Sequence, residues 1–138
     1  MKIKQLARTM ILAAAAMLGI ALVRAQITGG FRWDGPLSRV ITPNGDGIND
    51  KAFFCFDNFA LSDVSGTIYT LLGAQVASLQ PPLNASSFPN NGCLQFHGNK
   101  EQFSTWDPLS QGQVHSGVYV YQVRSEGKAY SGTILVVR

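Results

Sequence analysis

Beyond its first 25 residues, the sequence contains no segment of ten or more residues with the 3.6-residue hydrophobic periodicity of an amphipathic helix. Instead, short runs rich in β-branched and aromatic residues alternate with clusters of Gly, Pro, Asn and Ser, a pattern typical of strands joined by turns. Such a chain cannot build its core from packed helices. The sequence therefore predicts an all-β fold, an antiparallel β-sandwich made of several short strands.

Six runs have the length and composition of strands, and we predict strands over residues 39–41, 51–56, 64–72, 74–79, 117–124 and 129–137. Gly73 tolerates the positive φ of a tight turn and favours a hairpin between two of them. A second hairpin turns at 125–128, and its return strand places alternate residues on one face, namely Tyr130, Gly132, Ile134 and Val136.

Residues 80–105 form a long segment without a clear strand pattern. A loop of this length is unusual in a compact domain. The segment therefore either carries function or contains a strand that the pattern conceals, for which 93–96 is the candidate.

The N-terminal residues 1–25 have the parts of a secretory signal peptide. Lys2, Lys4 and Arg8 precede an apolar stretch, and Ala25 ends a cleavage-site pattern. The stretch from 10 to 23 is shorter than the ~20 residues that cross a bilayer, which argues against a membrane anchor. We therefore expect cleavage after Ala25, export through the periplasm to the cell surface or medium, and no membrane span in the mature chain.

The charge balance excludes a nucleic-acid-binding surface once this leader is set apart. The whole chain has eleven Lys and Arg against eight Asp and Glu, a formal net charge of +3. Four of the eleven basic residues lie in the first 25 positions, so the remainder carries a net charge of about −1. A domain without a basic patch is not expected to bind DNA or RNA.

Cys55 and Cys93 are the two cysteines of the chain. In an oxidising compartment two cysteines pair more often than they stay free, so we expect a disulfide, with two buried thiols as the alternative. The bond would contribute about 4 kcal/mol in the chain-entropy model. It would also attach the 80–105 segment to the core.

The densest group of oxygen-bearing groups lies between Pro43 and Asp50. Its glycines separate five candidate calcium positions, Asn44, Asp46, the Ile48 carbonyl, Asn49 and Asp50. One tight loop with this spacing could surround a hard cation, although the EF-hand pattern fails because Cys55 stands where the glutamate would be. The alternative is a turn in which Asn and Asp side chains accept hydrogen bonds from their own backbone, without a metal.

The sequence predicts no enzyme. His97 and His115 are the two histidines, and no nucleophile motif such as GxSxG accompanies them. The carboxylates are scattered and form no evident acid–base pair. We expect Trp106 to fill one end of the core.

Three blocks occur in a characteristic order: ITPNGDGIND at 41–50, SGTIY at 65–69, and a C-terminal block running from Trp106-Asp107 through SGVYVYQV at 116–123 to Arg138. Together they resemble the bacterial immunoglobulin-like domains described as gliding motility-associated or type IX secretion type B C-terminal domains. The blocks are also similar to the immunoglobulin-like domain of the flagellar hook-capping protein. The resemblance covers residues 38–138, which leaves 26–37 as an N-terminal extension.

The resemblance implies an immunoglobulin-like β-sandwich without catalytic activity that acts in secretion and surface attachment. It implies a turn or calcium loop at Asn44, Asp46 and Asp50. Trp106 and Asp107 match the family's Trp-Asp-Gly, with Pro108 in place of the glycine, and the following block supplies the core and turn residues Gly117, Tyr119 and Tyr121.

Two functions follow from these observations. The first is a non-enzymatic secreted or cell-surface module that is structural, adhesive or associated with sorting, and that binds a protein partner or itself, for example through residues 26–37. The second is a small secreted glycan-binding protein or hydrolase that uses the 80–105 segment together with Trp106, His97 and His115.

Overall fold

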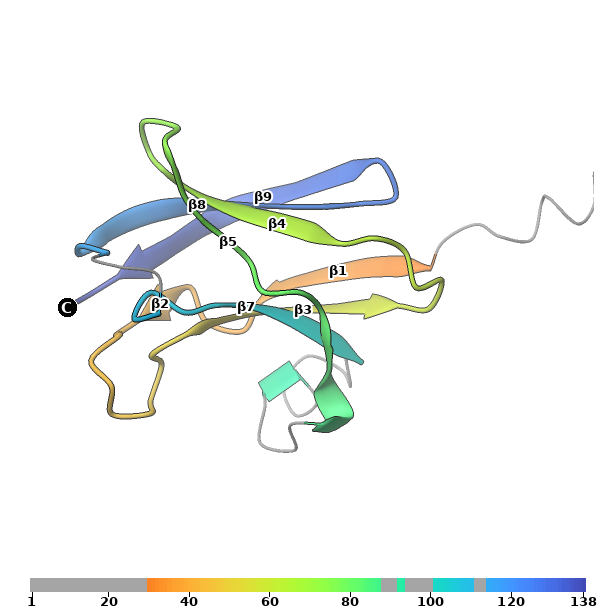
Figure 1. The fold of residues 1–138 in the computed structure, drawn as a ribbon, viewed down its shortest axis with the longest axis horizontal. Coiled ribbons are helices and arrows are strands. Elements are labelled where there is room, and N and C mark those ends of the chain that lie inside the picture. Colours follow the sequence, from red (N-terminus) through yellow and green to blue (C-terminus); the bar gives the residue numbers. More distant parts are fainter. Residues whose placement is uncertain (1–29, 88–91, 94–100, 111–113) are drawn as a thin grey trace, which may run out of the picture.

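A computed structural model describes residues 30–87, 92–93, 101–110 and 114–138. Within these residues the chain is built almost entirely of strands, arranged in two layers (Figure 1). The expected signal peptide, the cleavage site after Ala25, His97 and the candidate strand residues 94–96 lie outside the described residues.

The first sheet has four antiparallel strands in the order β1-β3-β7-β6, namely β1 (Phe31–Pro36), β3 (Ala52–Asn58), β7 (Gln102–Trp106) and β6 (Leu83–Asn84). A short 3-10 helix, Ala85–Ser87, follows β6. Strand β1 lies within the segment 26–37, which we expected to precede the domain, so sheet structure begins before residue 38.

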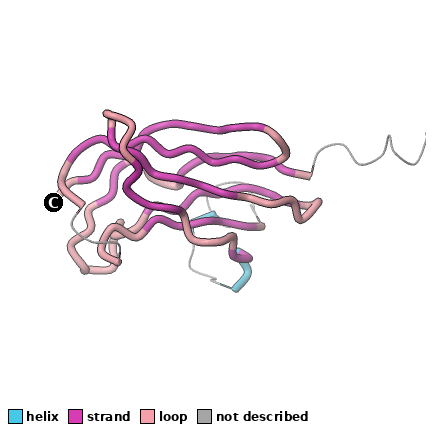
Figure 2. Tube along the Cα trace, turned by 45° about the horizontal axis from the view of Figure 1, so that its top comes forward, coloured by secondary structure: helices cyan, strands magenta, loops and turns pink. Residues whose placement is uncertain are grey.

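The second sheet has five strands in the order β2-β9-β8-β4-β5, namely β2 (Val40–Ile41), β9 (Lys128–Val136), β8 (Gly117–Ser125), β4 (Ser65–Thr70) and β5 (Gln75–Ser78). Only β2 and β9 run parallel; the other neighbours are antiparallel. The strands of the two layers run along the length of the molecule, and most connections gather at its ends (Figure 2).

Both hairpins form where the turn residues predicted them. Gly73 has φ of 85° and follows β4, and the Thr70 N–H donates to the Ala74 carbonyl at 2.8 Å. Glu126 and Gly127 have φ of 50° and 72° and form a two-residue turn between β8 and β9. Positive φ at both central positions matches the twist of the flanking strands, which explains the close hairpin.

The main core lies between the two sheets. Alternate residues of β3 point inward, Phe54 and Phe56 among them, and meet the inward residues of β8. The ring of Phe54 lies 5.0 Å from that of Tyr121, and the ring of Trp33 lies 5.9 Å from it. Since these contacts join one sheet to the other, the aromatic side chains fix how the layers pack.

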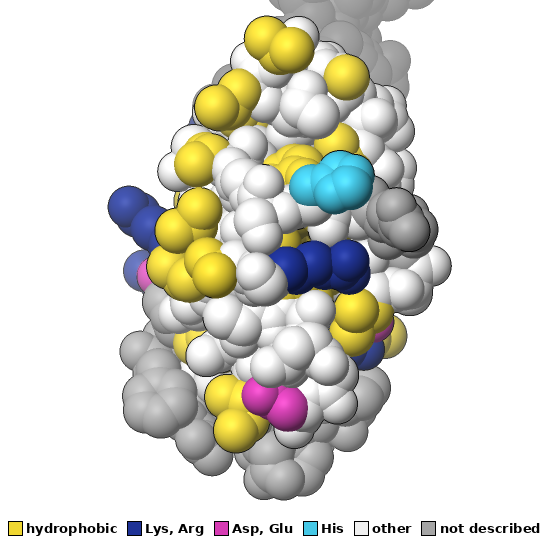
Figure 3. Space-filling model, turned by 90° about the vertical axis from the view of Figure 1, so that its left-hand side faces the viewer, with side chains coloured by type: hydrophobic (Ala, Val, Ile, Leu, Met, Phe, Trp, Pro, Cys, Tyr) yellow, Lys and Arg dark blue, Asp and Glu magenta, His cyan; other side chains and the backbone are white. Residues whose placement is uncertain are grey.

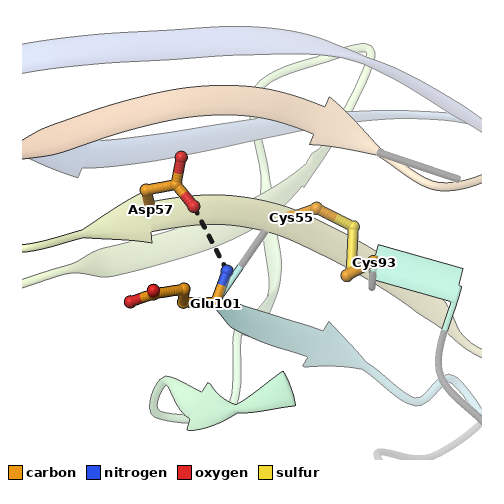
Figure 4. Close-up of a disulfide and its surroundings, with 4 residues drawn as sticks. All are labelled: Cys55, Asp57, Cys93 and Glu101. Atoms are coloured by element: carbon orange, nitrogen blue, oxygen red, sulfur yellow. Dashed lines mark hydrogen bonds between the residues drawn. A yellow bond between two sulfur atoms is a disulfide. The ribbon is translucent and has the colours of Figure 1, made fainter. Parts of the chain in front are cut away.

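A second, smaller cluster covers the outer face of β3 and β7. Cys55 and Cys93 form a disulfide, and both are fully buried with Phe103 and Ala85 (Figure 4). This disulfide confirms the expected pairing. Because the cluster covers the second face of β3, the strand is apolar on both sides rather than alternating.

Candidate functional site

The loop between β2 and β3 is organised around one carboxylate, that of Asp50. Its Oδ1 accepts hydrogen bonds from the N–H groups of Asn44 and Gly45, each at 2.8 Å, and its Oδ2 accepts one from Gly47 at 2.7 Å. The glycines make this possible, since both have φ of 84°, where a side chain would be strained. The backbone of the loop therefore surrounds the carboxylate of Asp50, which belongs to the same loop.

Asn44 and Asp46 complete this hydrogen-bonded loop. The Asn44 Oδ1 accepts from the Asp46 N–H at 2.9 Å, and the Asp46 Oδ1 accepts from the Ile48 N–H at 2.8 Å. The Ile48 carbonyl accepts a hydrogen bond from the Thr42 hydroxyl, and Asn49 has a positive φ of 55°. These bonds correspond to the turn interpretation, in which the polar side chains hold their own backbone.

The N–H groups also set the acidity of Asp50. The hydrogen bond from Gly45 lowers the pKa of the Asp50 carboxyl below its ordinary value; desolvation opposes this effect, while Gly47, Asn44 and the Lys51 charge add to it. The loop is therefore held by an ionised carboxylate at neutral pH.

An ion pair links this loop to the turn that follows β7. Lys51 Nζ lies 2.8 Å from Asp107 Oδ2, while Asp107 Oδ1 accepts from the Leu109 N–H at 3.0 Å. Burial raises the pKa of Asp107, but Lys51 and the turn N–H groups outweigh it, and the pKa lies below its ordinary value. Pro108, buried within this turn, supplies the fixed φ that suits its second position.

Trp106 and Tyr119 fill the core beside this ion pair. Trp106 is fully buried, and its ring meets that of Tyr119 edge-on with centroids 5.4 Å apart. The Tyr119 hydroxyl donates to the His115 carbonyl at 2.9 Å, which anchors the chain just before β8 begins at Gly117.

A cavity of about 400 Å³ lies on the outer face of the first sheet, next to the Asp50 loop. Its apolar lining comes from β3, β6 and β7, and its polar lining comes from the loop, from Lys51 and from Thr105 of β7. The lining residues are Gly47, Asn49, Asp50, Lys51, Phe53, Leu83, Phe103 and Thr105. The volume lies within the range of small-ligand sites, and the mixed lining suits a ligand with an apolar face and polar edges.

The sequence pattern indicated only part of the lining of this cavity. Asn49 and Asp50 were predicted as calcium positions or turn residues and Phe53 as part of a strand, whereas Phe103 and Thr105 belong to β7, which the pattern did not reveal. The described lining includes neither histidine nor a pair of carboxylates, and His115 is exposed elsewhere. In the described part of the chain, no group of three His, Cys, Asp or Glu side chains is arranged to hold a metal.

Across the same described ranges, no helix has the length and apolarity required to cross a membrane. Comparison of the chain with protein-family models, with curated proteins and with solved structures gives no match. The assignment of function therefore depends on the geometry of the molecule itself.

Proposed function

We propose that this protein is an exported, non-enzymatic immunoglobulin-like module that works at the cell surface through binding, as a structural, adhesive or sorting-associated domain of the gliding motility or type IX secretion type. The observation that carries the proposal is the strand order of the two sheets. A rigid two-sheet body presents loops and edges to partners, and such bodies are common among cell-surface domains.

The strand order supports the immunoglobulin-like arrangement in detail. Immunoglobulin domains have strands A, B, E and D in one sheet and C, F and G in the other, with C′ added beside C in variable-type domains. Taken along the chain, β1-β3-β7-β6 corresponds to A-B-E-D, and β9-β8-β4-β5 corresponds to G-F-C-C′. Strand β2 then corresponds to the end of strand A, which crosses from the first sheet to the second.

Tyr119 gives independent support. In the tyrosine corner of immunoglobulin domains, a Tyr near the start of strand F donates to the backbone a few residues upstream. Tyr119 lies near the start of β8 and donates to the carbonyl of His115. The position two residues later, which holds a cysteine in antibody domains, is Tyr121 here, and it packs on Phe54 of β3.

The disulfide supports export, because such bonds persist in oxidising compartments. It is buried and joins Cys55 of β3 to Cys93 of the 80–105 segment, 38 residues further along the chain. The charged leader and the apolar stretch that follows it are consistent with the same route.

The outer face of the second sheet supports a binding role. Strand register places Val40, Leu135 and Val118 side by side, and they are 45%, 39% and 40% exposed. At the end of the molecule that carries the C-terminus, hydrophobic side chains are numerous and lie among separate charged ones (Figure 3). The uncharged row of Val40, Leu135 and Val118 suits the centre of a contact with another protein.

Cell fractionation tests the proposal. The full chain, expressed in its source cell, should be recovered from the envelope or medium with Gln26 as its first residue and with both cysteines protected from alkylation. Ala15→Arg, which places a charge in the apolar stretch, should retain the protein inside the cell. Recovery of the uncleaved, reduced chain from the cytoplasm would contradict the proposal.

Glycan binding is a second candidate, favoured by the cavity beside the Asp50 loop. Its apolar side, with Phe53 and the exposed Leu83, suits the face of a sugar ring, and Thr105 offers a hydroxyl at the edge. Titration with soluble chitin and cellulose trimers should shift the amide resonances of these three residues. Thr105→Ala should weaken binding, whereas Thr67→Ala on the opposite sheet should not. Unchanged resonances at millimolar oligosaccharide would reject this candidate.

A further inference from the structure

One strand edge of the molecule is long and largely open. Strand β9 pairs with β8 over all nine residues without a register shift, whereas β2 covers only Leu135 and Val136 on its other side. The hairpin therefore extends well past β2, which lies near one end of it (Figure 1). The rest of this edge has no partner strand among the described residues.

The backbone groups on this open edge can be identified. The Leu135 N–H points to β2, where it donates to the Arg39 carbonyl at 2.8 Å. Because alternate residues of a strand direct their N–H and C=O groups to the same side, those of Ala129, Ser131 and Thr133 also point away from β8. Three donors and three acceptors in a regular row therefore face outward.

The other edges of the two sheets carry features that discourage pairing. Strand β1 has a register shift between Trp33 and Gly35 and ends at Pro36. Strands β2 and β6 have two residues each, and β5 has four, with a register shift against β4 that leaves its Val76 without a partner residue. Bulges, prolines and shortness are the usual protections of edge strands. The open part of β9 has none of them, and its only charged residue is Lys128, at its end.

We propose that this edge pairs antiparallel with the β9 edge of a second copy, about a two-fold axis near Ser131, to form one continuous ten-stranded sheet. An edge that pairs with itself satisfies the two-fold rule, by which the same patch is used on both molecules. The side chains of Ala129, Ser131 and Thr133 are small and uncharged, so identical strands approach without repulsion.

The charges at the two ends of the open edge favour the antiparallel arrangement. Arg39 lies beside β9 at the end where β2 begins, and Glu126 lies in the turn at the other end. Antiparallel pairing about Ser131 brings both Glu126 and Lys128 of each copy toward Arg39 of the other, so the charges at each end are mixed, whereas parallel pairing would place only like charges together. The short pairing gives an interface at the small end of the known range, so the dimer should be weak.

Sedimentation velocity tests this inference. The full chain, purified as the cell holds it, should show a monomer–dimer equilibrium between about 10 µM and 1 mM, the range of weak complexes. Ser131→Pro removes an N–H that faces the open edge and takes nothing from the β8 ladder, so it should weaken association at least tenfold. Ser131→Ala keeps the N–H and should associate as the wild type does.

Two further measurements test the inference without relying on the folding of the Ser131→Pro variant. Ser131→Lys keeps the backbone donor but sets two ammonium groups near each other, so it should weaken the dimer at low salt and recover at high salt. In the wild type, the amide of Ser131 should become more protected from hydrogen exchange as concentration rises, while that of Leu135, already bonded to β2, should not change.

A chain that stays monomeric at 1 mM would overturn the inference, as would a folded Ser131→Pro variant that associates like the wild type. The inference goes beyond the proposed export and surface role. Localisation in the cell and association in solution are measured separately, so either can fail alone.

Discussion

Asp50 closes the loop between β2 and β3 with a single side chain, because three backbone N–H groups converge on its carboxylate. Asp50→Asn keeps the shape but loses the charge and one acceptor oxygen. We expect faster hydrogen exchange at the amides of Asn44, Gly45 and Gly47 and a lower thermal midpoint. Asp63→Asn, at an exposed position, is the matched control and should change neither. Unaltered exchange in the Asp50 variant would show that the loop holds itself without this charge.

The same carboxylate makes stability depend on pH. The folded-state pKa values of Asp50 and Asp107 lie below the ordinary value of 3.8. A lowered folded pKa contributes stability above the unfolded pKa, and that stability is lost as pH falls through the folded pKa. The thermal midpoint should therefore be level near neutral pH and should fall below about pH 4, less steeply in Asp50→Asn. An equally steep fall in both proteins would assign the acid sensitivity to other groups.

Tyr119 anchors the start of β8 through one hydroxyl. Tyr119→Phe removes the donor to the His115 carbonyl and leaves the ring against Trp106. The free energy of unfolding should fall by about 0.5–1.5 kcal/mol, the usual contribution of one such bond. Tyr69→Phe, on the outer face of β4, should have little effect. Denaturant unfolding measures both, and equal stabilities would exclude an anchoring role for the bond.

At the scale of elements, β8 and β9 fit together because a glycine faces an aromatic ring. A Cβ on Gly132 would lie 2.4 Å from the Tyr121 hydroxyl oxygen, and that ring is packed against Phe54 and Trp33. Gly132→Ala must displace the ring and should cost about 1–3 kcal/mol, as overpacking does. Ser131→Ala, the next residue on the opposite face, should be neutral. Calorimetry that finds both variants equally stable would refute the close fit.

The disulfide links β3 of the first sheet to Cys93 in the 80–105 segment. Replacing Cys55 and Cys93 together by Ala should lower the free energy of unfolding by about 2–5 kcal/mol, the usual cost of losing such a bond. The wild type unfolded with reductant should show the same loss, which serves as the control. Equal stability of the oxidised and cysteine-free proteins would mean that the pairing of β6 with β7 and the packing of Phe103 and Ala85 hold this part of the chain without the bond.

At the scale of the whole molecule, calcium can act only by binding the folded state more tightly than the unfolded one. Both oxygens of Asp50 already accept backbone N–H groups, and the Asp46 carboxylate accepts from Ile48. We therefore expect the thermal midpoint to be the same in millimolar calcium and in chelator. A midpoint several degrees higher in calcium would establish the loop Asn44–Asp50 as a cation site.

The sequence by itself determined the elements that depend on residues close together in the chain. The alternation in 117–124 and 129–137 predicted β8 and β9, and Gly73 predicted the hairpin between β4 and β5, since side-chain period and turn chemistry act over a few residues. The cysteine count and the export pattern likewise predicted the disulfide. The crowding of Asn and Asp at 44–50 predicted a polar loop.

Only the tertiary structure decided the rest. Strand β1 is interrupted by a register shift at Trp33–Gly35, and β7 is buried on both faces, by the main core through Trp106 and by the second cluster through Phe103, so neither shows the alternation that marks a strand. Three further features depend on which distant segments lie together. They are the orientation of the Asp50 carboxylate toward the loop backbone, the cavity lined by Phe53, and the open edge of β9. Pairing of that kind is set by burial against partners far along the chain, which no local pattern records.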